Sequence, residues 1–229
     1  MLQTLRYRSV VRWLTAVSCL RRGRVLDMGC GDGAFVRVLR RGGWEAFGAD
    51  PAWAGGGAPP HCYADLDALA RAQPDPFDIA VSNFSLEHCA DPTATLRDWS
   101  RRLRPGGWIF VRVPNHAAVL RAGRLGRFQA SRPGHAAVFD PDSLRRLLAQ
   151  AGFREIRLGT PLCTTAALTP PCSLFPGLDP VRPRSAPAAA ARVLLLGLLS
   201  FLFLPYTMAL CRGNRGFVLA ASGRKGSAA

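Results

Sequence analysis

Residues 24–160 alternate short apolar runs with segments of helical spacing, and no other feature restricts the fold of this chain as strongly. Strand–helix–strand units pair their strands in parallel, and helices then cover both faces of the sheet. We therefore predict an α/β fold with a doubly wound, mostly parallel sheet. The predicted strands are residues 24–29, 45–50, 61–65, 77–83, 108–114, 154–160 and 216–222.

Helix signals fall between these strands. Asp91 and Asp140 are suited to cap helices, and each precedes a proline at the first helical position. The basic N-terminal segment superficially resembles a targeting peptide, but the first strand begins near Arg24. We therefore interpret the segment as an amphipathic helix of the mature protein. Its apolar face consists of Val10, Trp13, Leu14 and Val17.

The composition of the chain changes after residue 160. We divide it into a core at 1–160, a Pro/Ala-rich loop or linker at 161–192, an apolar segment at 193–212, and the last strand with a tail at 213–229. Residues 193–210 carry no charge, but Pro205 interrupts them. A full membrane crossing would separate the last strand from its sheet. We expect this apolar helical insertion to lie on a membrane surface, with a helix buried in the fold as the alternative.

Charge and cysteine content restrict partners and location. The formal net charge is +15. Such an excess favours phosphate in nucleic acid or anionic lipid, although arginines scattered over solvated faces would also account for it. The chain has seven cysteines and no C-x-x-C pair, which argues against a disulfide framework or a structural zinc site. We expect a cytoplasmic protein, with peripheral attachment to the inner face of a membrane as a further expectation.

The strongest local motif is the run Asp27-Met28-Gly29-Cys30-Gly31-Asp32-Gly33, directly after a predicted strand and before a helix. Its glycines permit a tight turn and a close approach of backbone N–H groups to a ligand. An acid, Asp50, ends the second strand and is placed to accept hydrogen bonds from ribose hydroxyls. These residues alone fit either a dinucleotide or another adenosine-containing cofactor.

The later pattern resembles that of the class I S-adenosylmethionine-dependent methyltransferases, and within them the broad small-molecule and lipid methyltransferases. The resemblance covers roughly residues 1–160 and implies a Rossmann-like fold whose last strand is 216–222. The matching segments are "VLDMGCGDG", "GADP", "YADLDAL", "FDIAVSNFSLEHCADP", "LRDWSRRLRPGGWIFVRVPN" and "LRRLLAQAGF".

The resemblance also implies roles for individual residues around S-adenosyl-L-methionine. Asp27 would anchor the amino end of the methionine moiety, beside the Gly29-Cys30-Gly31 backbone. Asp50 would bind the ribose. The remaining expected cofactor contacts are Asp65 to the adenine amino group, Leu66 against the ring, and Ser82 and Asn83 facing the methionine moiety. A helix N-cap is the alternative role for Asp65.

A hydroxyl or phenol acceptor would need a general base, and we take His88 and His135 as the catalytic candidates. No metal site is predicted. Metal-assisted quinone-type O-methyltransferases carry a glutamate three positions before the glutamate of a Glu-His pair, and this chain has Phe84 there. The "SNFS" segment also differs from the turn of amino-methylating nucleic-acid enzymes, so a nucleic-acid partner is not expected.

The sequence thus predicts methyl transfer to a small, apolar or lipid-linked acceptor by in-line displacement. Two alternatives stay open. One is an NAD-type oxidoreductase that uses the same glycine loop, and the other is a non-catalytic membrane-associated module of the same fold. Neither the acceptor atom nor the oligomeric state follows from the sequence, because specificity on this fold lies in loops.

Overall fold

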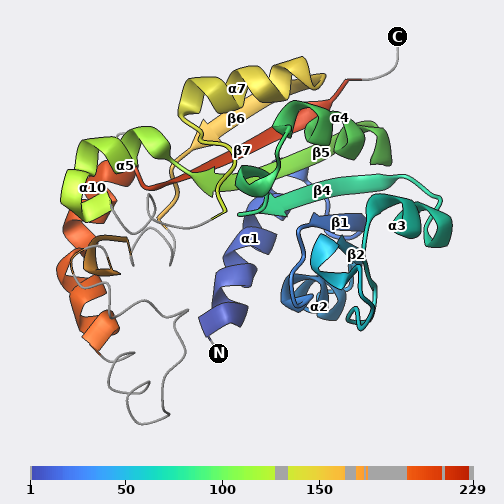
Figure 1. The fold of residues 1–229 in the computed structure, drawn as a ribbon, viewed down its shortest axis with the longest axis horizontal. Coiled ribbons are helices and arrows are strands. Elements are labelled where there is room, and N and C mark those ends of the chain that lie inside the picture. The colour runs from blue at the N-terminus through green and yellow to red at the C-terminus, as the bar shows by residue number, and fades with distance from the viewer. Residues whose placement is uncertain are drawn as a thin grey trace.

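The computed structural model describes residues 2–126, 134–162, 169–172, 174, 195–212 and 215–226. It contains a seven-stranded sheet in the order β3-β2-β1-β4-β5-β7-β6 (Figure 1). β7 is antiparallel to both neighbours, and the other pairs are parallel. The predicted doubly wound, mostly parallel fold is confirmed. The strands are β1 Arg24–Met28, β2 Glu45–Ala49, β3 Cys62–Tyr63, β4 Phe77–Asn83, β5 Leu103–Pro114, β6 Phe153–Gly159 and β7 Val218–Lys225.

Helices cover both faces of the sheet (Figure 1). One face packs against α1 (Leu2–Ser18) and α2 (Ala34–Arg41), whose apolar side chains share a core with β1, β4 and β5. The other face packs against α3 (Leu66–Ala72), α4 (Pro92–Arg102) and α7 (Pro141–Gln150). In α1, Val10 and Leu14 are buried and Trp13 and Val17 are partly buried, as the predicted apolar face requires.

Both predicted Asp-Pro helix starts are confirmed. The Asp91 carboxylate accepts hydrogen bonds from the N–H groups of Thr93 and Ala94, both at 2.9 Å. Asp140 accepts one from the Ser143 N–H at 2.7 Å, and the Ser143 hydroxyl accepts one from the Asp140 N–H, which completes a capping box. These bonds satisfy N–H groups that the first helical turn leaves without partners.

The fifth strand begins earlier than predicted. We expected it at residue 108, whereas β5 begins at Leu103, which pairs with Phe77. The register then shifts, because Ile79 pairs with Trp108 and the intervening Arg-Pro-Gly-Gly turn bulges out of the ladder. Lys225, in β7, holds this region by donating to the Ser100 and Leu103 carbonyls at 2.7 and 2.6 Å.

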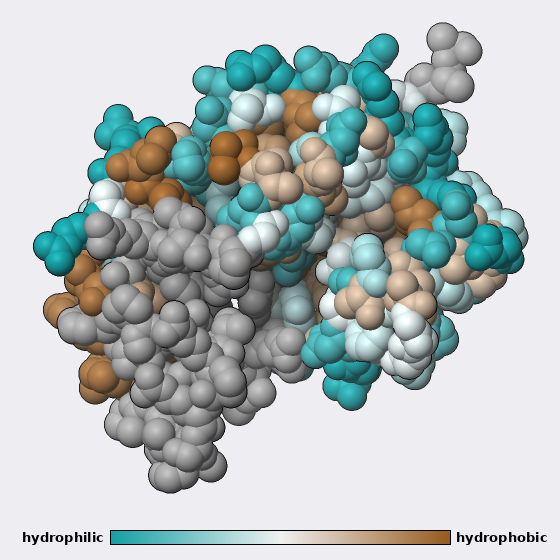
Figure 2. Space-filling view, in the orientation of Figure 1, coloured by the Kyte–Doolittle hydropathy of each residue, from teal (hydrophilic) through white to brown (hydrophobic). Residues whose placement is uncertain are grey.

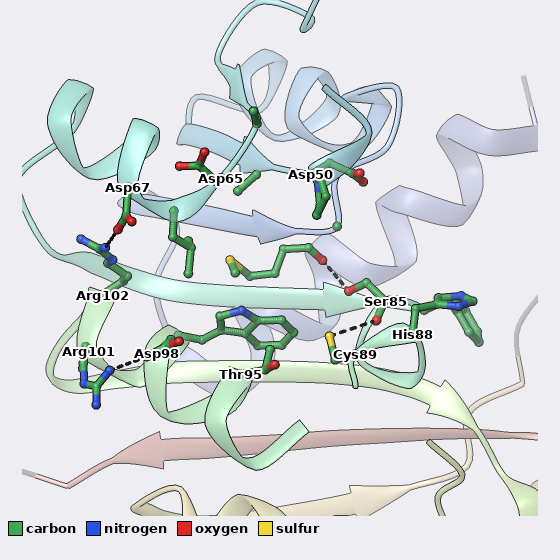
Figure 3. Close-up of a pocket in the computed structure, with 18 residues that line it drawn as sticks. Asp50, Asp65, Asp67, Ser85, His88, Cys89, Thr95, Asp98, Arg101 and Arg102 are labelled. Atoms are coloured by element: carbon green, nitrogen blue, oxygen red, sulfur yellow. Dashed lines mark hydrogen bonds and ion pairs between the residues drawn. The ribbon is translucent and has the colours of Figure 1, made fainter. Parts of the chain in front are cut away.

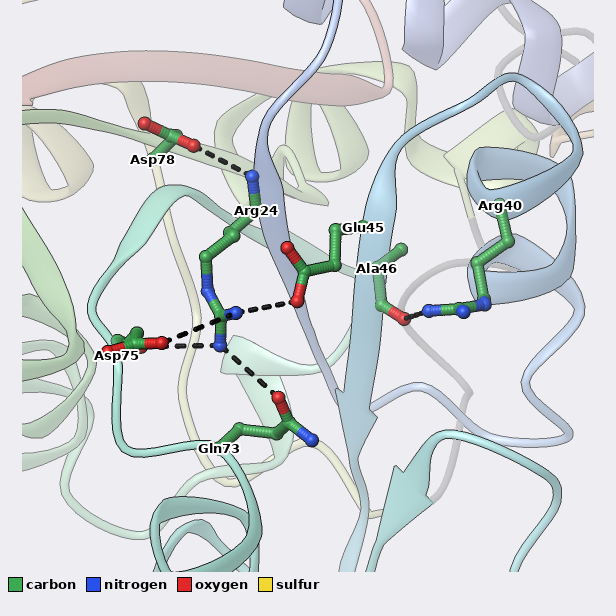
Figure 4. Close-up of polar contacts among 7 residues, drawn as sticks. All are labelled: Arg24, Arg40, Glu45, Ala46, Gln73, Asp75 and Asp78. Carbon is green, nitrogen blue, oxygen red and sulfur yellow. Dashed lines mark hydrogen bonds and ion pairs between the residues drawn. The ribbon is translucent and has the colours of Figure 1, made fainter.

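At the amino ends of the strands, Arg24 connects several segments (Figure 4). Its guanidinium donates to Glu45 at 2.6 Å and to the Gln73 side chain at 3.3 Å. Its own N–H donates to the Asp78 carboxylate at 2.7 Å. These polar contacts lie opposite the end of the sheet that carries the predicted site, so they serve the fold.

The apolar segment forms two helices, Leu195–Leu202 and α10 (Leu204–Arg212), bent by 50°. The bend precedes Pro205, whose ring cannot continue a straight helix. Tyr206 and Leu210 pack against residues of β7 and of α5 (His116–Ala122). Among the described residues no single helix has the length and composition of a membrane span, although the bent pair together passes that test. Most of the predicted 161–192 loop lies outside the described residues.

Candidate functional site

The strand order places the site. From β1, the strands β2 and β3 are added successively on one side, whereas β4 lies on the other side of β1, so the strand order reverses at β1. Parallel sheets bind ligands beyond the carboxyl ends of the strands at such a reversal. Here Met28 of β1 pairs with Ser82 of β4, so the glycine motif and the "SNFS" segment are neighbours.

The glycine loop is tightly packed against the residues that follow β4. Gly29 has φ +74°, and a Cβ added there would lie 2.3 Å from the Ser85 Cβ. The Ser85 hydroxyl donates to the Met28 carbonyl at 2.5 Å (Figure 3). A side chain at position 29 would therefore separate the two segments that form the floor of the site.

The second-strand acid, Asp50, is fixed by the loop it faces. Its Oδ2 accepts from the Gly31 N–H at 2.8 Å and its Oδ1 from the Ala52 N–H at 2.9 Å. The Trp53 indole N–H donates to the Gly31 carbonyl at 2.9 Å. A carboxylate has about four lone-pair sites, so two or so remain for ribose hydroxyls.

A cavity of about 980 Å³ lies at this point (Figure 3). It is lined by acidic, basic, apolar and histidine side chains from β1, β2, α3, α4 and the segment after β4. Its two arginines, Arg101 and Arg102, pair with Asp98 and Asp67. Asp65 both lines the cavity and caps α3 by accepting from the Ala68 N–H at 2.6 Å, so the two roles considered for it are compatible. The predicted site residues that line this cavity are Gly29, Asp50, Asp65, Leu66 and His88.

Asp27 lies beneath the loop, only 3% exposed. Burial raises its pKa to about 7, and the negative charge of Asp50 adds to the effect. A buried carboxyl in this state gains most from a cationic ligand that replaces its lost hydration. Its predicted contact with an amino group is chemically consistent with this environment.

Five predicted cofactor contacts do not line the cavity: Asp27 and Gly31, described above, and Cys30, Ser82 and Asn83. The Cys30 side chain is buried beside Cys62, and burial raises the pKa of its thiol. The Ser82 hydroxyl is buried and lies 2.7 Å from the Ser85 hydroxyl. Asn83 has a buried Oδ1 with no hydrogen-bond partner among the described residues. The proposed roles of these residues stay predictions.

The two predicted catalytic histidines are neighbours, with ring centroids 5.1 Å apart. His88 Nδ1 lies 2.7 Å from the Gly134 carbonyl oxygen. Because a carbonyl can only accept, this bond places a proton on Nδ1, so in the neutral imidazole the lone pair is on Nε2.

Glu87, His88 and His135 form a group that sequence reasoning did not assemble. Each offers one ligand atom, and these atoms all lie within 4.8 Å of one another, so the group could hold a metal ion. One carboxylate and two imidazoles suit a divalent transition metal. His135 therefore provides a third donor although Phe84 occupies the position of the expected glutamate.

Sequence reasoning missed two further residues near the site. Ser85 connects the glycine loop to the end of β4. It is part of the "SNFS" segment that the sequence singled out, but no role was assigned to it. Arg112 is 3% exposed on β5, and its guanidinium carbon lies 5.3 Å from the Phe84 ring centroid. A charge inside the apolar run "WIFVRVP" was the available signal.

Comparison with known proteins gives a family match. A family model described as a methyltransferase domain matches residues 2–158. A ubiquinone biosynthesis O-methyltransferase of Paracidovorax citrulli is 31% identical over 118 residues, which is 46% of this chain and 50% of that protein. The chain spans about half the length of the curated relatives it matches.

Solved structures agree on the fold. A SAM-dependent methyltransferase of Archaeoglobus fulgidus aligns with a TM-score of 0.55 and 19% identity, covering 96% of this chain and 94% of that one. Phosphoethanolamine N-methyltransferase 2 of Haemonchus contortus, in complex with S-adenosyl-L-methionine, aligns with a TM-score of 0.54 and 14% identity, covering 96% of this chain and 53% of that one.

Proposed function

Because the chain belongs to the methyltransferase domain family, we propose that it moves a methyl group from S-adenosyl-L-methionine to a hydroxyl of a small apolar acceptor. Membership confirms the family that the sequence predicts and, with it, the cofactor. The hydroxyl is proposed because relatives of this chain are named ubiquinone biosynthesis O-methyltransferases. An apolar hydroxylated acceptor of that kind also suits the exposed apolar side chains of Leu198, Phe201 and Leu202.

The placement of three carboxyl groups carries the proposal. Asp50 and Asp65 line the cavity at the point of strand reversal, and Asp27 is buried beneath its floor. Asp50 and Asp65 match hydroxyl and amino donors of an adenosine, and Asp27 matches an ammonium group. The sulfonium of the cofactor is positively charged and is attracted to these three carboxyl groups, whereas the other cavity acids, Asp98 and Asp67, pair with Arg101 and Arg102.

The chemistry asks little of the protein beyond positioning. When bound, S-adenosyl-L-methionine supplies an electrophilic methyl group. The acceptor oxygen would form the new C–O bond as the S–C bond breaks, and the electron pair of the S–C bond would stay on sulfur. The chain must hold the oxygen in line with the methyl group. His88 Nε2 would take the acceptor proton, because Nδ1–H is held by the Gly134 carbonyl.

The exposed apolar surface of the two helices in 195–212 supports the proposal that the acceptor reaches the enzyme from a membrane. Figure 2 shows hydrophobic surface over the α10 region at the left of the view. Leu198, Phe201 and Leu202 are 63, 76 and 70% exposed. Exposed apolar side chains gathered on one segment are typical of a contact surface for lipid or protein. We propose peripheral membrane contact there, with Arg212 at the end of α10 suited to lipid phosphate.

Labelled S-adenosyl-L-methionine tests this function. The full chain is incubated with cell extract, and label is counted in lipid, small-molecule, protein and RNA fractions. We expect it in the lipid or apolar small-molecule fraction, in a product that base does not hydrolyse, as an ether requires. Binding of NADH without binding of S-adenosyl-L-methionine would favour the oxidoreductase alternative. Cofactor binding that never yields a labelled product would favour the non-catalytic module.

A further inference from the structure

We propose that a second cavity, centred on Arg112, binds a carboxylate or phosphate group carried by the acceptor. The proposal rests on the proposed function and narrows its substrate class to apolar acceptors with an anionic group. The cavity measures about 450 Å³ and lies between α1 and the β5, β6 and β7 strands. We call it the arginine cavity. Its lining includes Val10, Trp13, Val17, Arg112, Arg157 and Ser222.

Arg112 is the reason to expect a ligand. The residue is 3% exposed, and its Nη2 is buried with no hydrogen-bond partner among the described residues. Among the described residues no carboxylate forms an ion pair with Arg112, and its guanidinium carbon lies 5.3 Å from the Phe84 ring centroid. A buried guanidinium without a counter-charge is strongly unfavourable, and a bound anion would remove the cost.

Other polar groups in the cavity agree with an anion. The Ser222 hydroxyl is buried and also has no partner among the described residues. Ser222 pairs with Phe110 on one side and with Arg157 on the other, and Arg112 pairs with Ala220. This register places Arg112, Arg157 and Ser222 on one face of the sheet. None of the described lining residues is acidic.

The apolar wall of the arginine cavity indicates what the ligand carries besides its anionic group. Val10, Trp13 and Val17 present the apolar face of α1 to the cavity. An inorganic ion would leave this wall without a partner, whereas an aromatic or alkyl body would cover it. A guanidinium fork is well matched to the two oxygens of a carboxylate or phosphate.

Phe84 and Arg112 connect the linings of the two cavities at the end of β4. Phe84 lines the cofactor cavity, its N–H donates to the Arg112 carbonyl at 2.8 Å, and its ring faces the Arg112 guanidinium. Asn83, at the end of β4, pairs with Arg112 in the sheet. An acceptor anchored at Arg112 would thus extend toward the strand end where methyl transfer is proposed.

Calorimetry on the full chain tests this site without requiring methyl transfer. The probes are 4-hexylbenzoate, 4-hexylphenyl phosphate and the neutral 4-hexylbenzamide. We expect at least one anion to bind about 10- to 100-fold more tightly than the amide, as a charge-assisted hydrogen bond predicts. Tighter binding of 4-hexylphenyl phosphate would assign the site to phosphate-bearing acceptors, and tighter binding of 4-hexylbenzoate would assign it to acceptors with a carboxylate. Equal binding of all three, or no binding, would overturn the proposal.

Variants locate the effect. Arg112→Met should remove the preference for the anions, and Arg112→Lys should retain part of it because the charge remains without the planar fork. Arg97→Met, an exposed arginine on α4, is the matched control and should leave the preference intact. Affinity for S-adenosyl-L-methionine, measured in parallel, should not change in Arg112→Met. If cofactor affinity falls while anion binding persists, Arg112 serves the cofactor and the proposal is wrong.

Discussion

The guanidinium of Arg112 lies over the ring of Phe84, with 5.3 Å between the guanidinium carbon and the ring centroid. Arg112 lines the arginine cavity, and Phe84 lines the cofactor cavity. Phe84 has φ +62°, a left-handed conformation that is unusual for an aromatic residue. Strained backbone of this kind persists where surrounding contacts enforce it. Here the Phe84 N–H bond to the Arg112 carbonyl and the stacked guanidinium both hold it.

A double-mutant cycle should detect this contact. Phe84→Leu keeps an apolar side chain but removes the aromatic face. With Arg112→Met as the second substitution, we expect a coupling free energy of about 0.5–2 kcal/mol in urea unfolding. Additive effects of the two substitutions would show that the stacking contributes nothing to stability.

Asp27→Asn should separate cofactor binding from stability. We expect affinity for S-adenosyl-L-methionine to fall about tenfold or more at pH 8, because the amide cannot balance a cation. For the unaltered protein, affinity should rise from pH 6 to pH 8, as Asp27, with its pKa near 7, loses its proton. Calorimetry in buffers of different ionisation enthalpy would register the proton released on binding at pH 6.

The same variant should be more stable than the unaltered apoprotein at pH 8. The folded-state pKa of Asp27 is about 7, above its ordinary value of 3.8, so the folded state holds the proton more tightly. The contribution of Asp27 to stability therefore declines as pH rises from about 4 to about 7. Asp142→Asn, at an exposed position of α7, should show no such gain. An unchanged midpoint for Asp27→Asn at pH 8 would contradict the assigned burial cost.

Two glycine substitutions in the loop should differ in their cost. Gly29→Ala places a methyl group 2.3 Å from the Ser85 Cβ, whereas a Cβ at Gly31 meets nothing within 4 Å. Both positions have positive φ, which costs about 1 kcal/mol for alanine. We expect Gly31→Ala to lose that amount in apoprotein unfolding, and Gly29→Ala to lose about 2–4 kcal/mol because of overpacking. Equal losses would mean that the two segments are not in tight contact.

His88→Gln tests the proposed base. Turnover should fall about 10²- to 10⁴-fold with unchanged cofactor affinity, since the side chain acts on the acceptor proton. His135→Gln should have a smaller effect if His88 alone takes the proton. EDTA should leave the activity of the unaltered protein unchanged. Loss of activity in EDTA with recovery on adding a divalent cation would instead assign Glu87, His88 and His135 to a metal site.

The exposed apolar helix should govern membrane binding. Replacing Leu198, Phe201 and Leu202 with serine should reduce flotation with anionic liposomes about tenfold or more. The serine side chains would lack the favourable free energy of transfer from water into the membrane that the apolar side chains provide. Leu120→Ser, an equally exposed leucine on α5, is the control and should float like the unaltered protein. If the unaltered chain fails to float, the surface is a protein contact.

The sequence by itself determined the fold and the acidic side of the site. Strand periodicity and Asp-Pro caps are local signals, and the glycine motif with Asp50 recurs at fixed positions on a parallel sheet. The bounds of β5 were not predictable, because the Arg-Pro-Gly-Gly bulge depends on pairing between Phe77 and Leu103. The packing of the apolar run was not predictable either: Tyr206 and Leu210 pack near β7, whereas Leu198, Phe201 and Leu202 are exposed.

Only the tertiary structure decided which polar groups meet. His88 and His135 lie far apart in the sequence, and their rings meet because the segment after α5 hydrogen-bonds to Glu87 and His88, which follow β4. In the sequence, Arg112 differs from the other arginines only by its place inside the apolar run "WIFVRVP". Its burial, its missing counter-charge among the described residues and its cavity arise from the placement of α1 on β5 and β7. Local sequence encodes elements, whereas the solvation of a charge depends on everything that packs around it.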